Sequence, residues 1–135
     1  MSAESDYLRA ERDNILRTID MIEDLTSREE LTTYETIALG KLLQDVYSGV
    51  ERILRSRLET YDIKIPKTES WHKELLLAAH QKSIISQDQF DALRKLLVFR
   101  HMEIHGYGFM LDEQRLRELA GPVPEICKDF LNNIS

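Results

Sequence analysis

Residues 32–61 read TTYETIALGKLLQDVYSGVERILRSRLETY and carry the longest helical pattern of the chain. Apolar residues recur here every three or four positions, which is typical of an amphipathic helix and not of a strand. Either Thr32 or Thr33 can cap this helix at its amino end. Gly40 and Gly49 each cost about 1 kcal/mol relative to Ala in a helix interior, or else they permit close helix packing. The apolar positions are Ile37, Leu42, Leu43, Val46, Val50, Ile53, Leu54 and Leu58.

Shorter helical patterns lie on both sides of this stretch. One covers about residues 5–25, and another covers about residues 69–81. The segment between residues 61 and 69 is a loop, because the residue before Pro66 is disfavoured in helical geometry. The chain has only five Gly and three Pro, and this composition favours helices over strands joined by turns.

The next helix has recognisable signals at both ends. Ser86 and Gln89 form a capping box, in which each side chain bonds to the other residue's backbone N–H. Gly106 and Gly108 are placed to end the helix, as glycines commonly do at a carboxyl end. The apolar residues between these signals include Phe90, Leu93, Leu96 and Leu97.

A last helical region follows, from about residue 112 to residue 134. Asp112 can cap its amino end. Pro122 and Pro124 are expected to kink or split the region, because proline disrupts the interior of a helix. Together the patterns predict an all-α antiparallel bundle of four or five helices, formed by a single domain over residues 1–135.

Composition narrows the setting in which the protein works. Cys127 is the only cysteine, so no internal disulfide can form and a reducing compartment is expected. The first residues are polar and partly acidic, unlike a signal peptide. No apolar run is long enough to cross a membrane. These features predict a cytoplasmic protein with no membrane partner.

The net charge of −6 argues against general affinity for nucleic acid, which depends on neutralising phosphates. The positive charge is nevertheless clustered, because Arg52, Arg55 and Arg57 lie within six positions. These cations form either a local basic surface or ordinary solvated helix faces. Further along the chain lie the basic residues Lys64, Lys67, Arg94, Lys95 and Arg100.

The strongest candidate site is Phe99-Arg100-His101-Met102-Glu103-Ile104-His105-Gly106-Tyr107-Gly108. Arg100 can hold a phosphate through a bidentate fork and stays charged at any working pH. His101 and His105 can exchange protons near neutral pH. Such a set can cleave RNA without a metal, and no cofactor is expected. The alternative without catalysis is a helix end whose positively charged side chains interact with the helix dipole.

Helical geometry spreads these residues around the axis. Arg100 and His105 are five apart, or roughly 140° around a helix of 3.6 residues per turn. The set therefore cannot face one narrow pocket within a single chain. It can line a groove if two copies of the helix pair about a two-fold axis, and this predicts a homodimer or a higher homo-oligomer. Leu93, Leu96 and Leu97 are expected at that interface.

The chain resembles the HEPN superfamily, and most closely the HepT-like ribonuclease toxins. The order Arg100, four residues, His105, one residue, Tyr107 matches the signature of that group. The segment Trp71-His72-Lys73-Glu74-Leu75-Leu76 is similar to a Trp-His-basic-x-Leu-Leu segment in these toxins, and Leu111-Asp112 also matches them. The residue after the Arg is often Asn in the family, whereas this chain has His101.

The resemblance implies a metal-independent endoribonuclease toxin of a prokaryotic cytoplasm that is active as a homodimer. Arg100 would bind the scissile phosphate, and His105 would act as general base or general acid. His101 would support one of these roles. The resemblance also implies a nucleotidyltransferase antitoxin of the MNT class, which silences the toxin by transferring AMP to Tyr107.

Three alternatives remain at this point. His101 and His105 have the spacing of a helical zinc pair, but Met102 stands where the metalloprotease motif requires Glu. His72 and His80 have no neighbouring ligand set and are expected at the surface or at an interface. The second alternative is a non-catalytic helical nucleotide-binding partner subunit of a nucleotidyltransferase. The third is a structural helical dimer that catalyses no reaction.

Overall fold

The computed structural model describes residues 3–104 and 112–134, and these form six helices without any strand. Their bounds are α1 Ala3–Thr26, α2 Thr33–Glu59, α3 Trp71–Gln81, α4 Gln87–Ile104, α5 Glu113–Ala120 and α6 Val123–Ile134. The predicted all-α bundle is therefore confirmed. The last predicted region is split into α5 and α6, and Pro122 stands between them.

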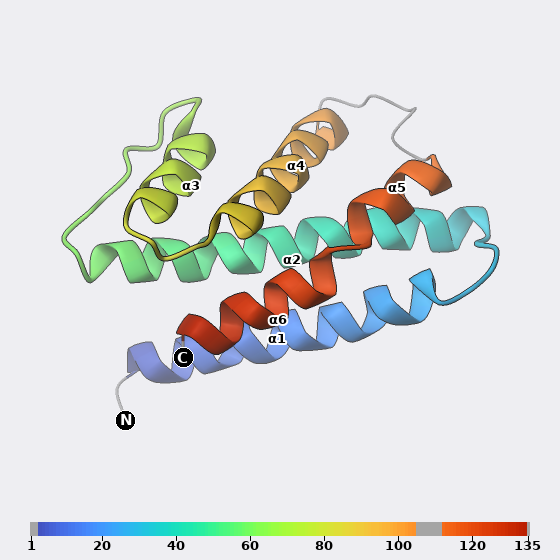
Figure 1. Ribbon diagram of the computed structural model, residues 1–135, viewed down its shortest axis with the longest axis horizontal. Coiled ribbons are helices and arrows are strands. Elements are labelled where there is room, and N and C mark those ends of the chain that lie inside the picture. Colours follow the sequence, from blue (N-terminus) through green and yellow to red (C-terminus); the bar gives the residue numbers. More distant parts are fainter. Residues whose placement is uncertain (1–2, 105–111, 135) are drawn as a thin grey trace.

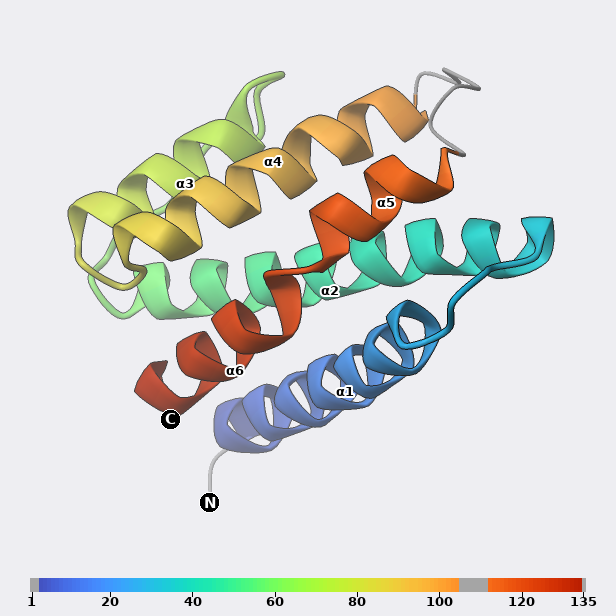
Figure 2. The same ribbon diagram turned by 45° about the vertical axis from the view of Figure 1, so that its right-hand side comes forward.

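Helix α2 is central, because it contacts α1, α3, α4 and α5. Helices α1 and α2 run side by side, and α6 lies along α1 (Figure 1). Helices α3 and α4 form a hairpin on another side of α2, as the turned view shows (Figure 2). This arrangement brings α2, α3 and α4 together, so residues far apart in the chain can meet.

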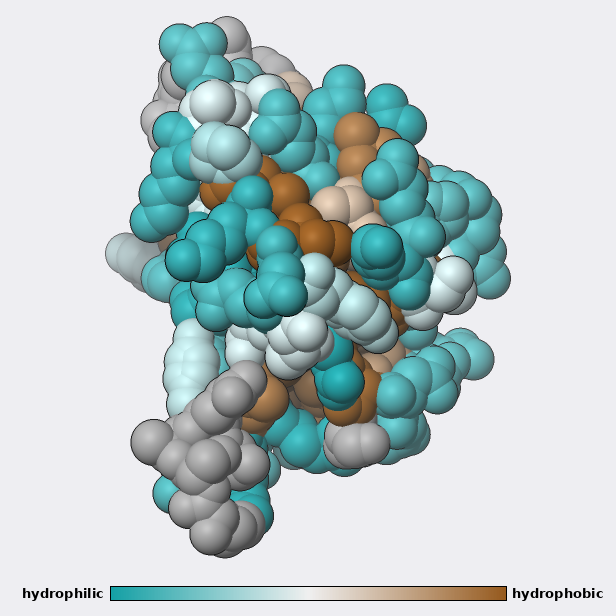
Figure 3. All heavy atoms as spheres, turned by 90° about the vertical axis from the view of Figure 1, so that its left-hand side faces the viewer, coloured by the Kyte–Doolittle hydropathy of each residue, from teal (hydrophilic) through white to brown (hydrophobic). Residues whose placement is uncertain are grey.

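One set of buried hydrophobic side chains fills the space between the helices. It includes Ile15 and Ile19 of α1, Leu54 of α2 and Phe130 of α6. Hydrophilic side chains surround a band of apolar atoms at the end of the molecule seen in Figure 3. None of the described helices combines the length and the apolar content needed to span a bilayer.

Local signals in the sequence place two helix starts correctly. The Thr32 hydroxyl accepts from the Glu35 N–H at 3.1 Å, and the Glu35 carboxylate accepts from the Thr32 N–H at 2.9 Å. Ser86 and Gln89 form the same reciprocal pair at 3.1 and 2.9 Å. These capping boxes satisfy backbone N–H groups that have no partner within the helix.

The other three predictions about helix ends and kinks have different outcomes. The Asp112 carboxylate accepts from the N–H of Gln114 at 3.0 Å, which confirms it as the cap of α5. Pro124 lies in the first turn of α6, where its missing N–H has no helical partner to lose. The predicted stop signals Gly106 and Gly108 lie outside the described residues.

Gly49 allows α1 and α2 to pack closely. A Cβ atom at this position would lie only 2.7 Å from Cγ1 of Ile15 on α1. Of the two interpretations of this glycine, close packing is therefore the one the structure supports. On α2, Glu51 is two residues further and roughly 200° around the helix axis. The surface of α2 that carries Glu51 consequently faces away from α1.

Candidate functional site

Arg100 lies in the carboxyl-terminal part of α4, and its half-buried side chain is directed towards α3. Its Nη1 atom lies 3.2 Å from Nε2 of His72, the second residue of α3. Arginine has five N–H donors and no acceptor. The guanidinium must therefore donate this bond, and Nε2 of His72 must accept it as an unprotonated nitrogen.

The other ring nitrogen of His72 contacts α2. Nδ1 lies 2.6 Å from Oε2 of Glu51, and the two side chains are only 23% and 11% exposed. Because Nε2 is the acceptor, Nδ1 carries the proton and donates it to the Glu51 carboxylate. A chain of two hydrogen bonds thus runs from Glu51 through a neutral His72 to Arg100.

Trp71 supports the imidazole of His72. The centroids of the two rings are 3.9 Å apart, and their planes are inclined by 31°. The guanidinium of Arg55 lies over the indole at 4.7 Å, and Nζ of Lys67 lies at 5.9 Å. Cations at these distances are attracted to the negative face of an indole. Two further positive charges are thereby held near the residue that orients Arg100.

Tyr47 lies one turn before Glu51 on α2 and is only 1% exposed. Its hydroxyl has no hydrogen-bond partner within the described structure. Burial, followed by the negative charge of Glu51, raises the pKa of Tyr47 far above its usual value, whereas the charge of Arg100 opposes this shift. The phenol therefore stays neutral near pH 7.

The remaining predicted site residues are only partly covered by the structure. His101 is exposed on α4, and it points roughly 100° away from Arg100 because the two are adjacent in a helix. His105 and Tyr107 lie outside the described residues. The structure therefore places Arg100 and His101, while the joint geometry with His105 and Tyr107 stays a prediction.

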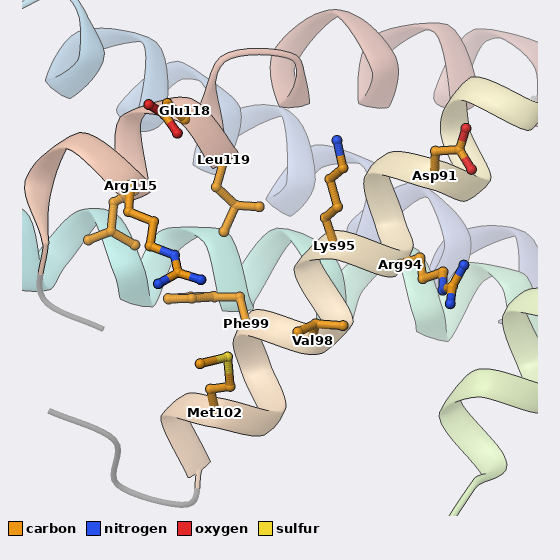
Figure 4. A pocket seen from close by; sticks show the side chains of 10 residues that line it. Asp91, Arg94, Lys95, Val98, Phe99, Met102, Arg115, Glu118 and Leu119 are labelled. Atoms are coloured by element: carbon orange, nitrogen blue, oxygen red, sulfur yellow. The ribbon is translucent and has the colours of Figure 1, made fainter. Parts of the chain in front are cut away.

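A groove of about 630 Å³ lies between α4 and α5, beside the candidate site. Figure 4 shows Val98, Phe99 and Met102 of α4 along it, with Arg115 of α5 extending towards the Phe99 ring. Val98 is 54% exposed. Within the described chain this groove is separate from the Glu51–His72–Arg100 chain, and Arg100 is not part of its lining.

Similarity to a known family identifies the kind of protein to which this site belongs. Residues 38–135 match the family model described as HepT-like protein. The chain belongs to the HepT-like family. The resemblance to HepT-like members of the HEPN superfamily is thereby confirmed. No curated protein and no solved structure is significantly similar to the chain.

Sequence reasoning overlooked two residues of this HepT-like protein. In the sequence Glu51 only begins the arginine-rich segment 51–57, and His72 is predicted to be a surface or interfacial residue with no neighbouring ligand set. His72 is instead half-buried and bonded on both ring nitrogens. The similarity of the Trp71-His72 segment to the family was the one available signal. His80, by contrast, stacks on Phe90 of α4 at 4.8 Å.

The expected role of two leucines at a dimer interface is corrected. Leu93 and Leu96 are each only 2% exposed and belong to the core of this chain, so they cannot face a second copy. Leu97 is half-buried, and the exposed apolar residue of this part of α4 is Val98. Helix α4 has apolar residues on most of its circumference, so the sequence does not indicate which side of the helix faces the core.

The described residues also test two other kinds of site, a metal site and a reactive thiol. No group of three or more His, Cys, Asp or Glu in residues 3–104 and 112–134 is placed to hold a metal ion. Cys127 is buried in α6, and this burial raises the pKa of its thiol to about 12. The thiol therefore stays protonated near neutral pH, and Cys127 is a core residue rather than a nucleophile.

Proposed function

We propose that this HepT-like protein is a metal-independent endoribonuclease toxin. The observation that carries the proposal is the placement of Arg100, held by His72 at 3.2 Å at the start of the Arg100–His105 motif. A guanidinium fixed in this way suits the recognition of a phosphodiester. Membership of the HepT-like family supports the same chemistry.

The proposed reaction divides the work between charge and proton transfer. Arg100 binds the scissile phosphate and stabilises the charge that grows on its oxygens in the transition state. The ribose 2′-oxygen attacks phosphorus while the bond to the leaving 5′-oxygen breaks. His105 removes the proton from the 2′-hydroxyl or delivers one to the 5′-oxygen, and His101 supports one of these transfers.

The proposed active form is a homodimer or a higher homo-oligomer. Two copies of α4 paired about a two-fold axis would bring the two sets of motif residues into one cleft. The α4–α5 groove supports this proposal, because Val98 is 54% exposed and Met102 and Leu119 are half-buried along it. The lining of the groove also includes charged residues such as Arg94 and Lys95, and its exposed apolar side chains gain stability when a second protein surface covers them.

The proposed regulator is a nucleotidyltransferase antitoxin of the MNT class, which transfers AMP to the hydroxyl of Tyr107. The tyrosine is two residues from His105 and seven from Arg100 in the sequence. An added phosphate near Arg100 would compete with the substrate phosphate for the guanidinium. Modification is therefore expected to prevent RNA binding without unfolding the protein.

The decisive experiment is cleavage of single-stranded RNA by the purified protein in excess EDTA. His105→Ala should abolish cleavage, because a proton-transfer group is lost. His80→Ala is the matched control, since His80 stacks on Phe90 and lies outside the motif. Circular dichroism should report the same helix content for all three proteins.

Three outcomes of this experiment would contradict the proposal or one of its assigned roles. Cleavage that disappears in EDTA and returns with a divalent ion would indicate metal-assisted hydrolysis. A well-folded protein that cuts no RNA but binds a nucleotide through Arg100 would favour the non-catalytic partner subunit of a nucleotidyltransferase. Cleavage by the wild type that survives His105→Ala would instead show that His105 is misassigned.

A further inference from the structure

We propose that Glu51 and His72 are positioning residues that fix the guanidinium of Arg100 for phosphate binding. The inference rests on the proposed function, because it deepens the role of the same arginine. Three helices each contribute one residue to this chain: Glu51 from α2, His72 from α3 and Arg100 from α4. The order of donors and acceptors in the chain decides what each residue can do.

Only one arrangement of protons satisfies both hydrogen bonds. Arg100 can only donate, so Nε2 of His72 at 3.2 Å must accept. An ionised Glu51 can only accept, so Nδ1 of His72 at 2.6 Å must donate. The carboxylate of Glu51 therefore selects the tautomer of His72 that offers a lone pair to Arg100. A protonated His72 would present an N–H to a guanidinium N–H, and the second bond would be lost.

The imidazole is also held in place by its surroundings. Contact with the tilted Trp71 ring, at 3.9 Å between the centroids, limits rotation of the imidazole, and the low exposure of Glu51 keeps water from competing for Nδ1. A long arginine side chain would otherwise sample many rotamers. Anchoring one N–H of Arg100 leaves its remaining donors in a fixed plane, ready for the two oxygens of a phosphate.

Two substitutions of His72 separate positioning from simple packing. In His72→Asn the side-chain amide ends near the place of Nδ1, so it can still donate to Glu51 but cannot reach Arg100. In His72→Gln the amide extends to the place of Nε2, so its oxygen can accept from Arg100 while Glu51 loses its donor. The two variants thus keep opposite halves of the chain.

The expected orders of activity and stability are opposite. His72→Asn should lower kcat for RNA cleavage by about 100-fold with little change in KM, as misplacement of a transition-state contact does. His72→Gln should retain at least about tenfold more activity than His72→Asn, because the acceptor for Arg100 is kept. His72→Gln should nevertheless melt at the lower temperature, since Glu51 is left buried without its donor.

Matched controls come from the same helix. His80→Asn and His80→Gln change the histidine that stacks on Phe90, and both should keep wild-type kcat and KM. If His72→Asn is as active as His72→Gln, or if activity follows melting temperature across the two His72 variants, the positioning role is refuted.

A spectroscopic measurement tests the geometry independently of any RNA cleavage. Nitrogen-15 NMR of the imidazole at pH 7.5 should show His72 with Nδ1 protonated and Nε2 unprotonated. The signal is assigned by its loss in His72→Gln. A dominant Nε2–H tautomer, or a doubly protonated ring, would overturn the inference. If the wild type cuts no RNA, the proposed function fails and this measurement alone decides the inference.

Discussion

Gly49→Ala tests whether the close approach of α1 and α2 is required for the fold. The added methyl group would lie 2.7 Å from Cγ1 and 3.1 Å from Cδ1 of Ile15, which is 2% exposed in the core. A contact shorter than 3.0 Å between carbon atoms cannot persist. Cγ1 sits next to the branch point of Ile15, so it cannot swing away as the tip of a long side chain does. Either the two helices separate, or Ile15 leaves its rotamer.

Two opposing terms set the size of the effect. Overpacking a filled core costs about 1–3 kcal/mol. Alanine in place of glycine in a helix interior raises the free energy of unfolding by about 1 kcal/mol. The net expectation is a loss of about 1 kcal/mol in the free energy of unfolding, or roughly 3 °C in Tm for a chain of this length. Urea denaturation followed by far-ultraviolet circular dichroism measures this difference.

The Ile15→Ala background provides the sharper test, because it removes both atoms that clash with the new methyl group. In that background Gly49→Ala should raise the free energy of unfolding by about 1 kcal/mol, since only the helix-propensity gain remains. A sign reversal of this kind is the expected interaction between neighbouring residues. Equal destabilisation in both backgrounds would show that close packing at Gly49 is not the cause.

Four other predictions address the site, the assembly and a helix cap. Arg100→Lys should lose most RNA cleavage in an initial-rate assay, because a point charge replaces a planar fork; wild-type rates would contradict this role. Val98→Asp should convert the proposed dimer to a monomer in light scattering, and with Val98 54% exposed it should change stability by less than about 0.5 kcal/mol. Thr32→Ala should cost about 1 kcal/mol in urea denaturation through loss of the capping box, and an unchanged midpoint would show the cap to be dispensable. Tyr107→Phe should gain no AMP mass on co-expression with the proposed nucleotidyltransferase antitoxin, and a label that persists would map the modification elsewhere.

The helices could be predicted from the sequence because their signals are local. The capping boxes at Thr32 and Ser86 join residues three apart, and both form as expected. The break between α5 and α6 follows from Pro122 in the same way. Such features depend on a few neighbouring residues, so no knowledge of the tertiary arrangement is needed to recognise them.

The chain of hydrogen bonds at the site could not be predicted because it is a product of helix packing. His72 is 21 residues from Glu51 and 28 from Arg100, and each residue lies on a different helix. Their contact depends on how the α3–α4 hairpin lies against α2. The spacing of residues within one helix does not predict a contact between helices, so the sequence does not reveal the partners of His72.

Packing also explains how an acidic protein can present a cationic site. Within the arginine-rich segment of α2, Arg52 pairs with Glu11 at 2.9 Å, and Arg57 donates to the carbonyl oxygen of Ile134. Both arginines therefore serve the attachment of α2 to other parts of the chain. Arg55 instead lies over Trp71, beside the ring that orients Arg100.

Because Arg52 and Arg57 attach α2 to other parts of the chain, few cations of the arginine-rich segment are left to bind the proposed RNA substrate. A protein that neutralises many phosphates binds any polyanion, and its affinity falls steeply with salt. A net charge of −6 opposes that mode of binding, and the cations found at the site are few and individually fixed. Under the proposed function, recognition of RNA consequently depends on the geometry imposed on Arg100 rather than on the total charge of the protein.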